Sequence, residues 1–71
     1  MSLAKMRKDA GLTQKDVAKA LGTVQATVAM WETGKSTPSF KNLCALSSLL
    51  NVSFNELCAA VNKVEDNTNA N

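Results

Sequence analysis

Apolar residues along this chain recur every three or four positions in five short segments, which is the spacing of one face of an α-helix. Glycine, asparagine or proline separates the segments, and these residues commonly end helices. The pattern predicts an all-α fold with helices at about residues 2–10, 13–21, 24–33, 39–50 and 53–64. Residues 65–71 have neither periodicity nor large apolar side chains, so we expect one domain over residues 1–64 and a disordered tail.

Residues that cap helices stand at most of the predicted helix ends. Four segments follow a serine or threonine whose hydroxyl can accept a hydrogen bond from the first turn, at Ser2, Thr13, Ser39 and Ser53. Asp16 and Glu56 follow two of these caps at capping-box spacing. The third helix begins at Val24, which has no acceptor oxygen, so its start should be poorly capped. We expect Val24, Val28 and Trp31 to face inward.

Composition supports packed helices. Of the 71 residues, 45% are hydrophobic and only 4% aromatic, so leucine, valine, alanine and methionine must form the core. The net charge of +2 is too small to indicate a nucleic-acid partner. Its distribution is more informative, because residues 1–41 carry seven basic and three acidic side chains, and residues 42–71 one and three. A basic half suits a phosphate-facing surface, although a solvated lysine-rich face has the same composition.

The sequence offers little chemistry for catalysis. It has no histidine, no nucleophile with a base at helical spacing and no metal-ligand spacing, so we expect no enzyme activity, catalytic residue, metal or cofactor. Cys44 and Cys58 lack CxxC spacing and no signal peptide precedes them, which predicts partly buried thiols in a reduced, cytoplasmic protein. No apolar run approaches the ~20 residues needed to span a membrane, and nothing indicates a small-molecule substrate.

A constellation of motifs carries a family resemblance over residues 2 to about 60: GLTQ, a turn at LGT, WETGK, Pro38 and NVSFNEL. Together they resemble the lambda-type Cro and CI repressors, the XRE-like helix-turn-helix family. Small Ala18 allows the second and third helices to approach, Gly22 forms their turn, and Val28 packs between them. The length is closer to the Cro type, a bare DNA-binding domain, than to the CI type with its added C-terminal domain.

The resemblance implies that the third helix lies in the major groove of DNA. Its outward residues are then the base-reading candidates Gln25, Ala26, Ala29 and Met30. A glutamine amide at Gln25 can pair with adenine, whereas the other three offer only contact with thymine methyl groups. Phosphate contacts are expected from Gln14, Thr27, Lys35, Ser36 and Asn42. Two alternatives stay open for the base-reading candidates. Ala26, Ala29 and Met30 are also residues that favour a helix, and Gln25 would occur equally at a solvated helix N-terminus.

Two further sets of residues have expected roles, one as an ion pair and one as a dimer interface. Arg7 and Glu32 match positions that often pair in this family, and their pair either orients the third helix or is a weak exposed ion pair. The expected dimer interface consists of Phe54, Leu57, Val61 and Val64, which exceed what a small core must bury. Phe54 and Leu57 are alternatively core residues, in which case the dimer forms only on DNA.

The resulting hypothesis is a sequence-specific DNA-binding transcriptional regulator, a phage Cro-type repressor. Its expected partner is a double-stranded palindromic operator, bound as a homodimer in the bacterial host cytoplasm at the nucleoid. A rival reading keeps the fold and makes it a protein-interaction module, such as an antitoxin-like regulator, that uses Ala26, Ala29 and Met30. Activation of a promoter is a further alternative.

Overall fold

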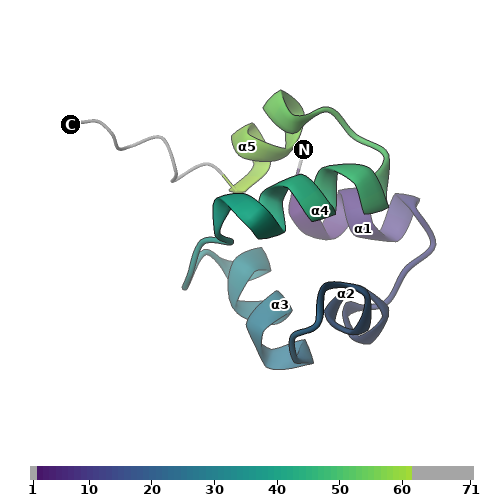
Figure 1. Ribbon diagram of the computed structural model, residues 1–71, viewed down its shortest axis with the longest axis vertical. Coiled ribbons are helices and arrows are strands. Elements are labelled where there is room, and N and C mark those ends of the chain that lie inside the picture. Colours follow the sequence, from purple (N-terminus) through teal and green to yellow (C-terminus); the bar gives the residue numbers. More distant parts are fainter. Residues whose placement is uncertain (1, 62–71) are drawn as a thin grey trace.

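The computed structural model describes residues 2–61 as five α-helices, with no strand in that range. Figure 1 shows them as a bundle of short helices joined by tight turns. The helices are α1 Leu3–Asp9, α2 Gln14–Leu21, α3 Gln25–Thr33, α4 Phe40–Leu50 and α5 Phe54–Val61. The predicted all-α, five-helix fold is therefore confirmed. Val64 and the proposed tail of residues 65–71 lie outside the described residues.

The predicted caps determine where the helices begin. The hydroxyls of Ser2, Thr13, Ser39 and Ser53 each accept a hydrogen bond from the backbone N–H three residues later. The carboxylates of Asp16 and Glu56 accept in return from the backbone N–H of Thr13 and Ser53, which completes both capping boxes. Because these bonds satisfy N–H groups that helices leave free, the local sequence fixes the helix starts.

Left-handed residues end α2, α3 and α4. Gly22 has φ 74° and Gly34 has φ 83°, conformations that cost little without a Cβ. Asn51 takes the same role after α4 at φ 57°. Each residue turns the chain sharply, and Gly22 in this way sets α3 across α2.

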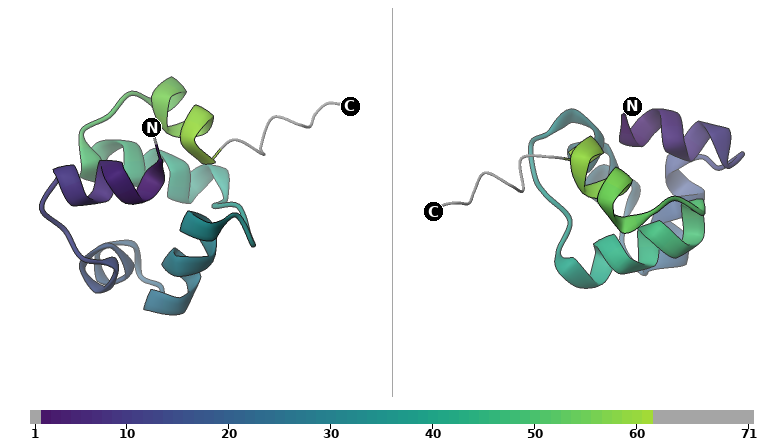
Figure 2. Two further views of the ribbon diagram at one scale, coloured as in Figure 1. Left: turned by 180° about the vertical axis from the view of Figure 1, so that it is seen from behind. Right: turned by 90° about the horizontal axis from the view of Figure 1, so that it is seen from above.

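The core gathers residues from all five helices. α2 packs on α3 and α4 on α5, and α1 contacts both α3 and α5. Figures 1 and 2 show α4 between the α2–α3 pair and α5. The buried apolar side chains are Leu3, Met6, Val17, Ala18, Val28, Trp31, Leu43, Leu46, Leu50, Leu57 and Val61. The α2–α3 unit therefore rests on a support formed by the other three helices.

Three sequence-based expectations about burial are wrong. Leu57 and Val61 are 0% and 6% exposed, so these two predicted dimer contacts belong to the core of one protomer. For Leu57 this is the core alternative that the sequence left open, whereas Phe54 is half-buried. Val24 is 63% exposed, because it is the extended N-cap of α3 and does not follow the helical period. Cys44 is exposed, although Cys58 is half-buried as expected.

Within residues 2–61, no single helix is long and apolar enough to cross a membrane. Only α4 and α5 together, bent by 117°, reach that length and composition.

Candidate nucleic-acid interface

The α2–α3 unit has the geometry of a helix-turn-helix. Val17 and Ala18 of α2 are 1% and 4% exposed, and Val28 and Trp31 of α3 are 1% and 5% exposed. The backbone N–H of Thr23 donates to the carbonyl of Ala18 at 2.9 Å, which closes the turn. The inner face of α3 is thus fixed on α2, and its outer face is left open.

The start of α3 is open to solvent. Its N-cap Val24 makes no side-chain capping bond, as the sequence predicts. Of the base-reading candidates, Gln25, Ala26 and Met30 are exposed and Ala29 is half-buried. All four lie on the helix face that the core does not use, so a groove could accept α3 without any change in the fold.

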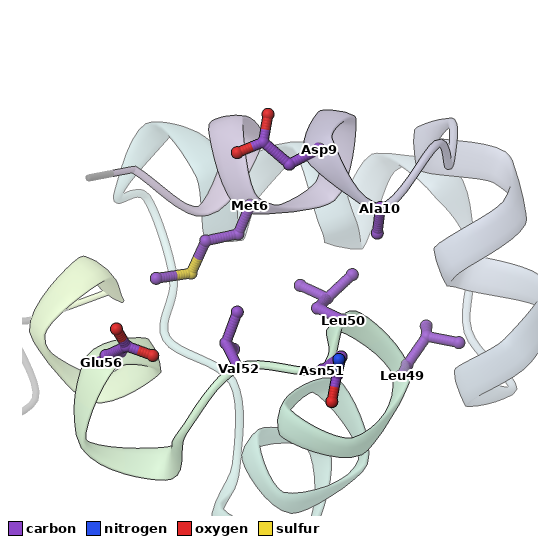
Figure 3. A pocket seen from close by; sticks show the side chains of 8 residues that line it. All are labelled: Met6, Asp9, Ala10, Leu49, Leu50, Asn51, Val52 and Glu56. Carbon is purple, nitrogen blue, oxygen red and sulfur yellow. The ribbon is translucent and has the colours of Figure 1, made fainter.

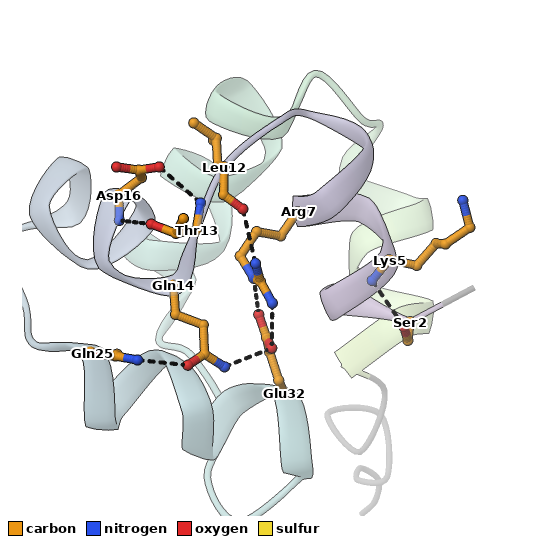
Figure 4. Close-up of polar contacts among 9 residues, drawn as sticks. All are labelled: Ser2, Lys5, Arg7, Leu12, Thr13, Gln14, Asp16, Gln25 and Glu32. Atoms are coloured by element: carbon orange, nitrogen blue, oxygen red, sulfur yellow. Dashed lines mark hydrogen bonds and ion pairs between the residues drawn. The ribbon is translucent and has the colours of Figure 1, made fainter.

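A chain of side-chain hydrogen bonds ties Gln25 to the scaffold (Figure 4). The amide Nε2 of Gln25 donates to Oε1 of Gln14 at 3.2 Å. The amide Nε2 of Gln14 donates in turn to Oε1 of Glu32 at 2.9 Å. Gln14 and Gln25 are the first residues of α2 and α3. The two glutamines therefore bridge the N-termini of both helices, a link that the sequence analysis did not identify.

The chain ends in a buried ion pair between Arg7 and Glu32. Arg7 Nε and Nη2 donate to the two carboxylate oxygens at 2.6 and 3.2 Å, and Nη1 donates to the Leu12 carbonyl at 2.9 Å. The side chains of Arg7 and Glu32 are only 11% and 7% exposed. The predicted pair thus exists, and its burial excludes the weak exposed alternative. It joins α1 to the last turns of α3 and to the loop before α2.

Both ionisable groups are held in their charged forms. The hydrogen bond to Glu32 raises the pKa of Arg7 above its ordinary value, against the effect of burial. Burial would raise the pKa of Glu32, but hydrogen bonds from Arg7 and Gln14, with the charges of Arg7 and Lys8, hold it below its ordinary value. The carboxylate that orients Gln14 is therefore ionised at neutral pH.

The phosphate candidates lie on α2, α3, the loop after α3 and the first turn of α4. Lys35 is exposed, and the others are half-buried: Gln14, Thr27, Ser36 and Asn42. The backbone N–H groups of Lys35 and Ser36 both donate to the Met30 carbonyl, at 2.9 and 3.3 Å, and hold this loop against the end of α3. The backbone of Lys35 and Ser36 is thus held next to the end of α3.

An exposed aromatic surface on α4 and α5 contains Phe54, which the sequence analysis predicted as a dimer contact, and three residues of α4 that it did not identify. Phe40 is 71% exposed and packs edge-on against half-buried Phe54, with ring centroids 5.6 Å apart. Phe40, Cys44 and Ser47 share one face of α4 by their i, i+4, i+7 spacing, and with Phe54 they line a hollow of about 340 Å³. Phe40 lies to one side of the buried stripe of α4, which consists of Leu43, Leu46 and Leu50. That offset is the sequence signal that could have identified Phe40 as exposed. We call these four residues the aromatic surface.

Comparison with known proteins agrees with the geometry. The family model described as helix-turn-helix matches residues 3–57. The chain is similar to the HTH-type transcriptional regulator DicA of Escherichia coli (strain K12), with 47% identity over 47 residues that cover 66% of this chain and 35% of DicA. It is also similar to the uncharacterized HTH-type transcriptional regulator YqaE of Bacillus subtilis (strain 168), with 36% identity over 56 residues that cover 79% of this chain and 48% of YqaE.

The chain thus spans about a third of one curated relative and about half of the other. No solved structure gives a significant match. Because the family model covers most of the residues that the structure describes, all five helices included in whole or in part, this chain belongs to the helix-turn-helix family.

Proposed function

We propose that this chain is a sequence-specific DNA-binding transcriptional regulator that inserts α3 into the major groove. The observation that carries the proposal is the exposed Gln25 at the first position of α3, held by Gln14 and the buried pair of Glu32 and Arg7. A fixed amide at a helix start is suited to reading a base edge. The names of the two relatives, both transcriptional regulators, support the same class.

The hydrogen bonds of Gln25 favour adenine as its base. One N–H of its amide donates to Gln14, which leaves the second N–H and the carbonyl oxygen for DNA. Adenine presents one acceptor and one donor in the major groove and matches this remaining pair of groups. Guanine presents two acceptors and would need both N–H groups. Adenine is thus the expected base at the position that Gln25 contacts.

Gln25→Ala tests the base contact. A bidentate contact is worth ~1–3 kcal/mol, so binding to sites selected from random DNA should fall roughly five- to 150-fold, with a smaller loss on random DNA. Asn55→Ala removes an exposed amide from α5 and is the matched control, which should leave both affinities unchanged. Equal losses on selected and random DNA would remove the claim of base reading.

Lys35→Gln tests the phosphate contacts separately. It should weaken binding to all sequences alike and reduce the salt slope of log K by ~0.9 for each protomer. A slope that does not change would mean that Lys35 contacts no phosphate. Gln14, Thr27, Ser36 and Asn42 are uncharged, so their substitution should lower affinity with little change in slope.

The finer proposal is a Cro-type repressor that acts in the bacterial cytoplasm as a homodimer on a palindromic operator. One small domain with few phosphate contacts binds weakly, and two copies on a two-fold site add their contacts. With Leu57 and Val61 in the core, the aromatic surface of Phe40, Cys44, Ser47 and Phe54 is the contact that we propose between the copies. Phe40 and the phosphate candidate Asn42 both lie in the first turn of α4, on different sides of the helix.

Sedimentation with and without DNA tests the dimer. Phe40→Ser should lower self-association and the cooperativity of binding to a palindrome, while binding to a half-site is retained. Ala45→Ser changes a neighbouring exposed residue of α4 and serves as the control. A dimer that persists unchanged in Phe40→Ser would place the contact elsewhere.

A protein-interaction module is the second candidate, because the outer face of α3 is partly apolar. Val24 and Met30 are 63% and 38% exposed, next to exposed Ala26. A gel-shift assay with competitor DNA separates the candidates, since a protein-binding module would show only weak, sequence-blind association. Transcription from a reporter promoter distinguishes repression from activation.

A further inference from the structure

A hollow of about 480 Å³ lies between the end of α1, the end of α4 and the first turn of α5 (Figure 3). Figure 3 shows the side chains of Met6, Leu50 and Val52 around its centre, with Glu56 at the α5 side and Asp9 on α1. The volume is within the range of pockets that hold small ligands, ~300–1,000 Å³. The site is separate from the DNA-facing residues proposed above.

The acidic residues of the described chain are divided between two places. Asp16 and Glu32 belong to the α2–α3 unit, where one caps α2 and the other pairs with Arg7. The remaining two, Asp9 and Glu56, both line the hollow. In Figure 3 the Asp9 carboxylate points away from the hollow, so Glu56 is the acidic group of this apolar recess.

Glu56 supplies most of the uncompensated charge. Asp9 already binds Lys5 at 2.8 Å, in an exposed pair. Glu56 accepts one hydrogen bond from the Ser53 N–H through Oε1, and within residues 2–61 it forms no ion pair. α4 ends at the hollow and α5 begins there, so the negative end of one helix dipole and the positive end of the other oppose each other, and the Glu56 carboxylate is the charge that a partner would meet.

We propose that this hollow is a docking site for a protein partner that presents an arginine next to an apolar side chain. The apolar part packs on Met6, Leu50 and Val52, and the guanidinium binds the Glu56 carboxylate at the rim. Arginine suits the site because its weakly hydrated, planar head has five donors for a carboxylate and nearby carbonyl groups. The inference goes beyond the proposed DNA binding.

The position of the hollow makes the two interactions compatible. Figures 1 and 2 show the turn between α4 and α5 on the side of the molecule away from the N-terminus of α3. A partner seated there would leave the reading face of α3 free.

The test is an NMR titration of the full chain with the blocked tripeptide acetyl-Leu-Arg-Leu-amide. Saturable shifts should appear at the Met6 methyl and at the amides of Leu50, Asn51 and Val52. The same peptide with citrulline in place of arginine has a similar shape without the charge. It should bind roughly two- to fivefold more weakly, the range expected for an exposed ion pair.

Charge variants locate the contact. Glu56→Gln removes the carboxylate and keeps a capping-box acceptor. It should lower the affinity for the arginine peptide by the same two- to fivefold. Asp9→Asn removes a carboxylate that already pairs with Lys5, so it should weaken binding of the arginine peptide less. Asp16→Asn removes one charge from α2, outside the hollow, and should leave the affinity unchanged.

Three results would overturn the proposal: no shifts at the hollow, equal affinity for the citrulline peptide, or an equal loss in Asp16→Asn. Urea midpoints of the variants establish that each is folded. The titration contains no DNA, so its failure leaves the proposed operator binding untouched, and a failure of operator binding leaves the titration interpretable.

Discussion

Removal of the Glu32 charge should destabilise this domain severely. Glu32→Gln keeps the shape of the side chain but leaves the Arg7 guanidinium, 11% exposed, without its counter-ion. Loss of one partner from a buried pair costs ~3–5 kcal/mol, because the other charge remains desolvated. The glutamine can still accept one hydrogen bond, so we expect about 3 kcal/mol, the lower end of that range. A small domain has only ~5 kcal/mol in total, so more than half of the stability would be lost.

Urea unfolding provides the measurement, with Trp31 fluorescence and far-UV circular dichroism as probes of the same transition. With a slope of ~1 kcal/mol per molar urea for a small domain, the midpoint should fall by about 3 M. The double variant Arg7→Met, Glu32→Leu removes both charges and should unfold within ~1 kcal/mol of the wild type, since apolar replacements of buried pairs are often neutral or stabilising. The reasoning is refuted if Glu32→Gln loses less than ~1 kcal/mol, the value of an exposed pair, or if the double variant loses as much as the single one.

The pH dependence of stability provides an independent check of the same pair. The pKa of Glu32 is lowered in the folded protein, so its contribution is complete above the unfolded value, ~4.3. The contribution is lost as pH falls through the lower folded pKa. The stabilities of wild type and Glu32→Gln should therefore differ by a constant amount above pH ~4.3 and converge as the pH falls below it. Asp16, whose pKa the Thr13 backbone N–H lowers, is present in both proteins and cancels in the difference.

Substitutions at three other positions test the fold. Val24→Asn supplies the side-chain cap that α3 lacks and should raise the unfolding free energy by ~1 kcal/mol; a lower urea midpoint would mean that the first turn is already satisfied. Gly34→Ala has space for its Cβ but a φ of 83°, so it should lose ~1 kcal/mol, and Gly34→Asn should lose less in the same assay. Leu57→Ala should lose ~2–5 kcal/mol by leaving a cavity, whereas a loss of a few tenths would assign Leu57 to the surface.

The sequence was sufficient to predict the helices because their ends are determined locally. Thr13 and Asp16 need only three residues between cap and partner, and Gly22 needs only its own backbone freedom. Burial was less predictable. Val24 follows the apolar period of α3 in sequence, but as an N-cap it lies outside the helix and is exposed. Leu57 depends on how α5 packs on α4 and α1, which no local pattern specifies.

The candidate site was also predictable from the sequence only in part. Gln25 was predicted from its place at the start of the third helix, and the Arg7–Glu32 pair was predicted from the family resemblance. The hydrogen bond between Gln14 and Gln25 joins residues 11 apart in sequence, and its direction depends on Glu32, a further seven residues along. A sequence pattern can indicate that each amide is near a helix start, but the orientation of each amide requires three-dimensional coordinates.

This orientation links the stability of the domain to its proposed reading of DNA. Glu32 can accept a hydrogen bond but cannot donate one, so it turns the N–H of Gln14 toward itself and the carbonyl oxygen of Gln14 toward Gln25. Gln25 must then donate to Gln14, which leaves one donor and one acceptor for a base. The double variant that removes Arg7 and Glu32 should therefore fold and still lose discrimination for adenine at the position that we propose Gln25 contacts. Site selection from random DNA with this variant separates the two roles, because retained discrimination would show that Gln25 needs no support from the ion pair.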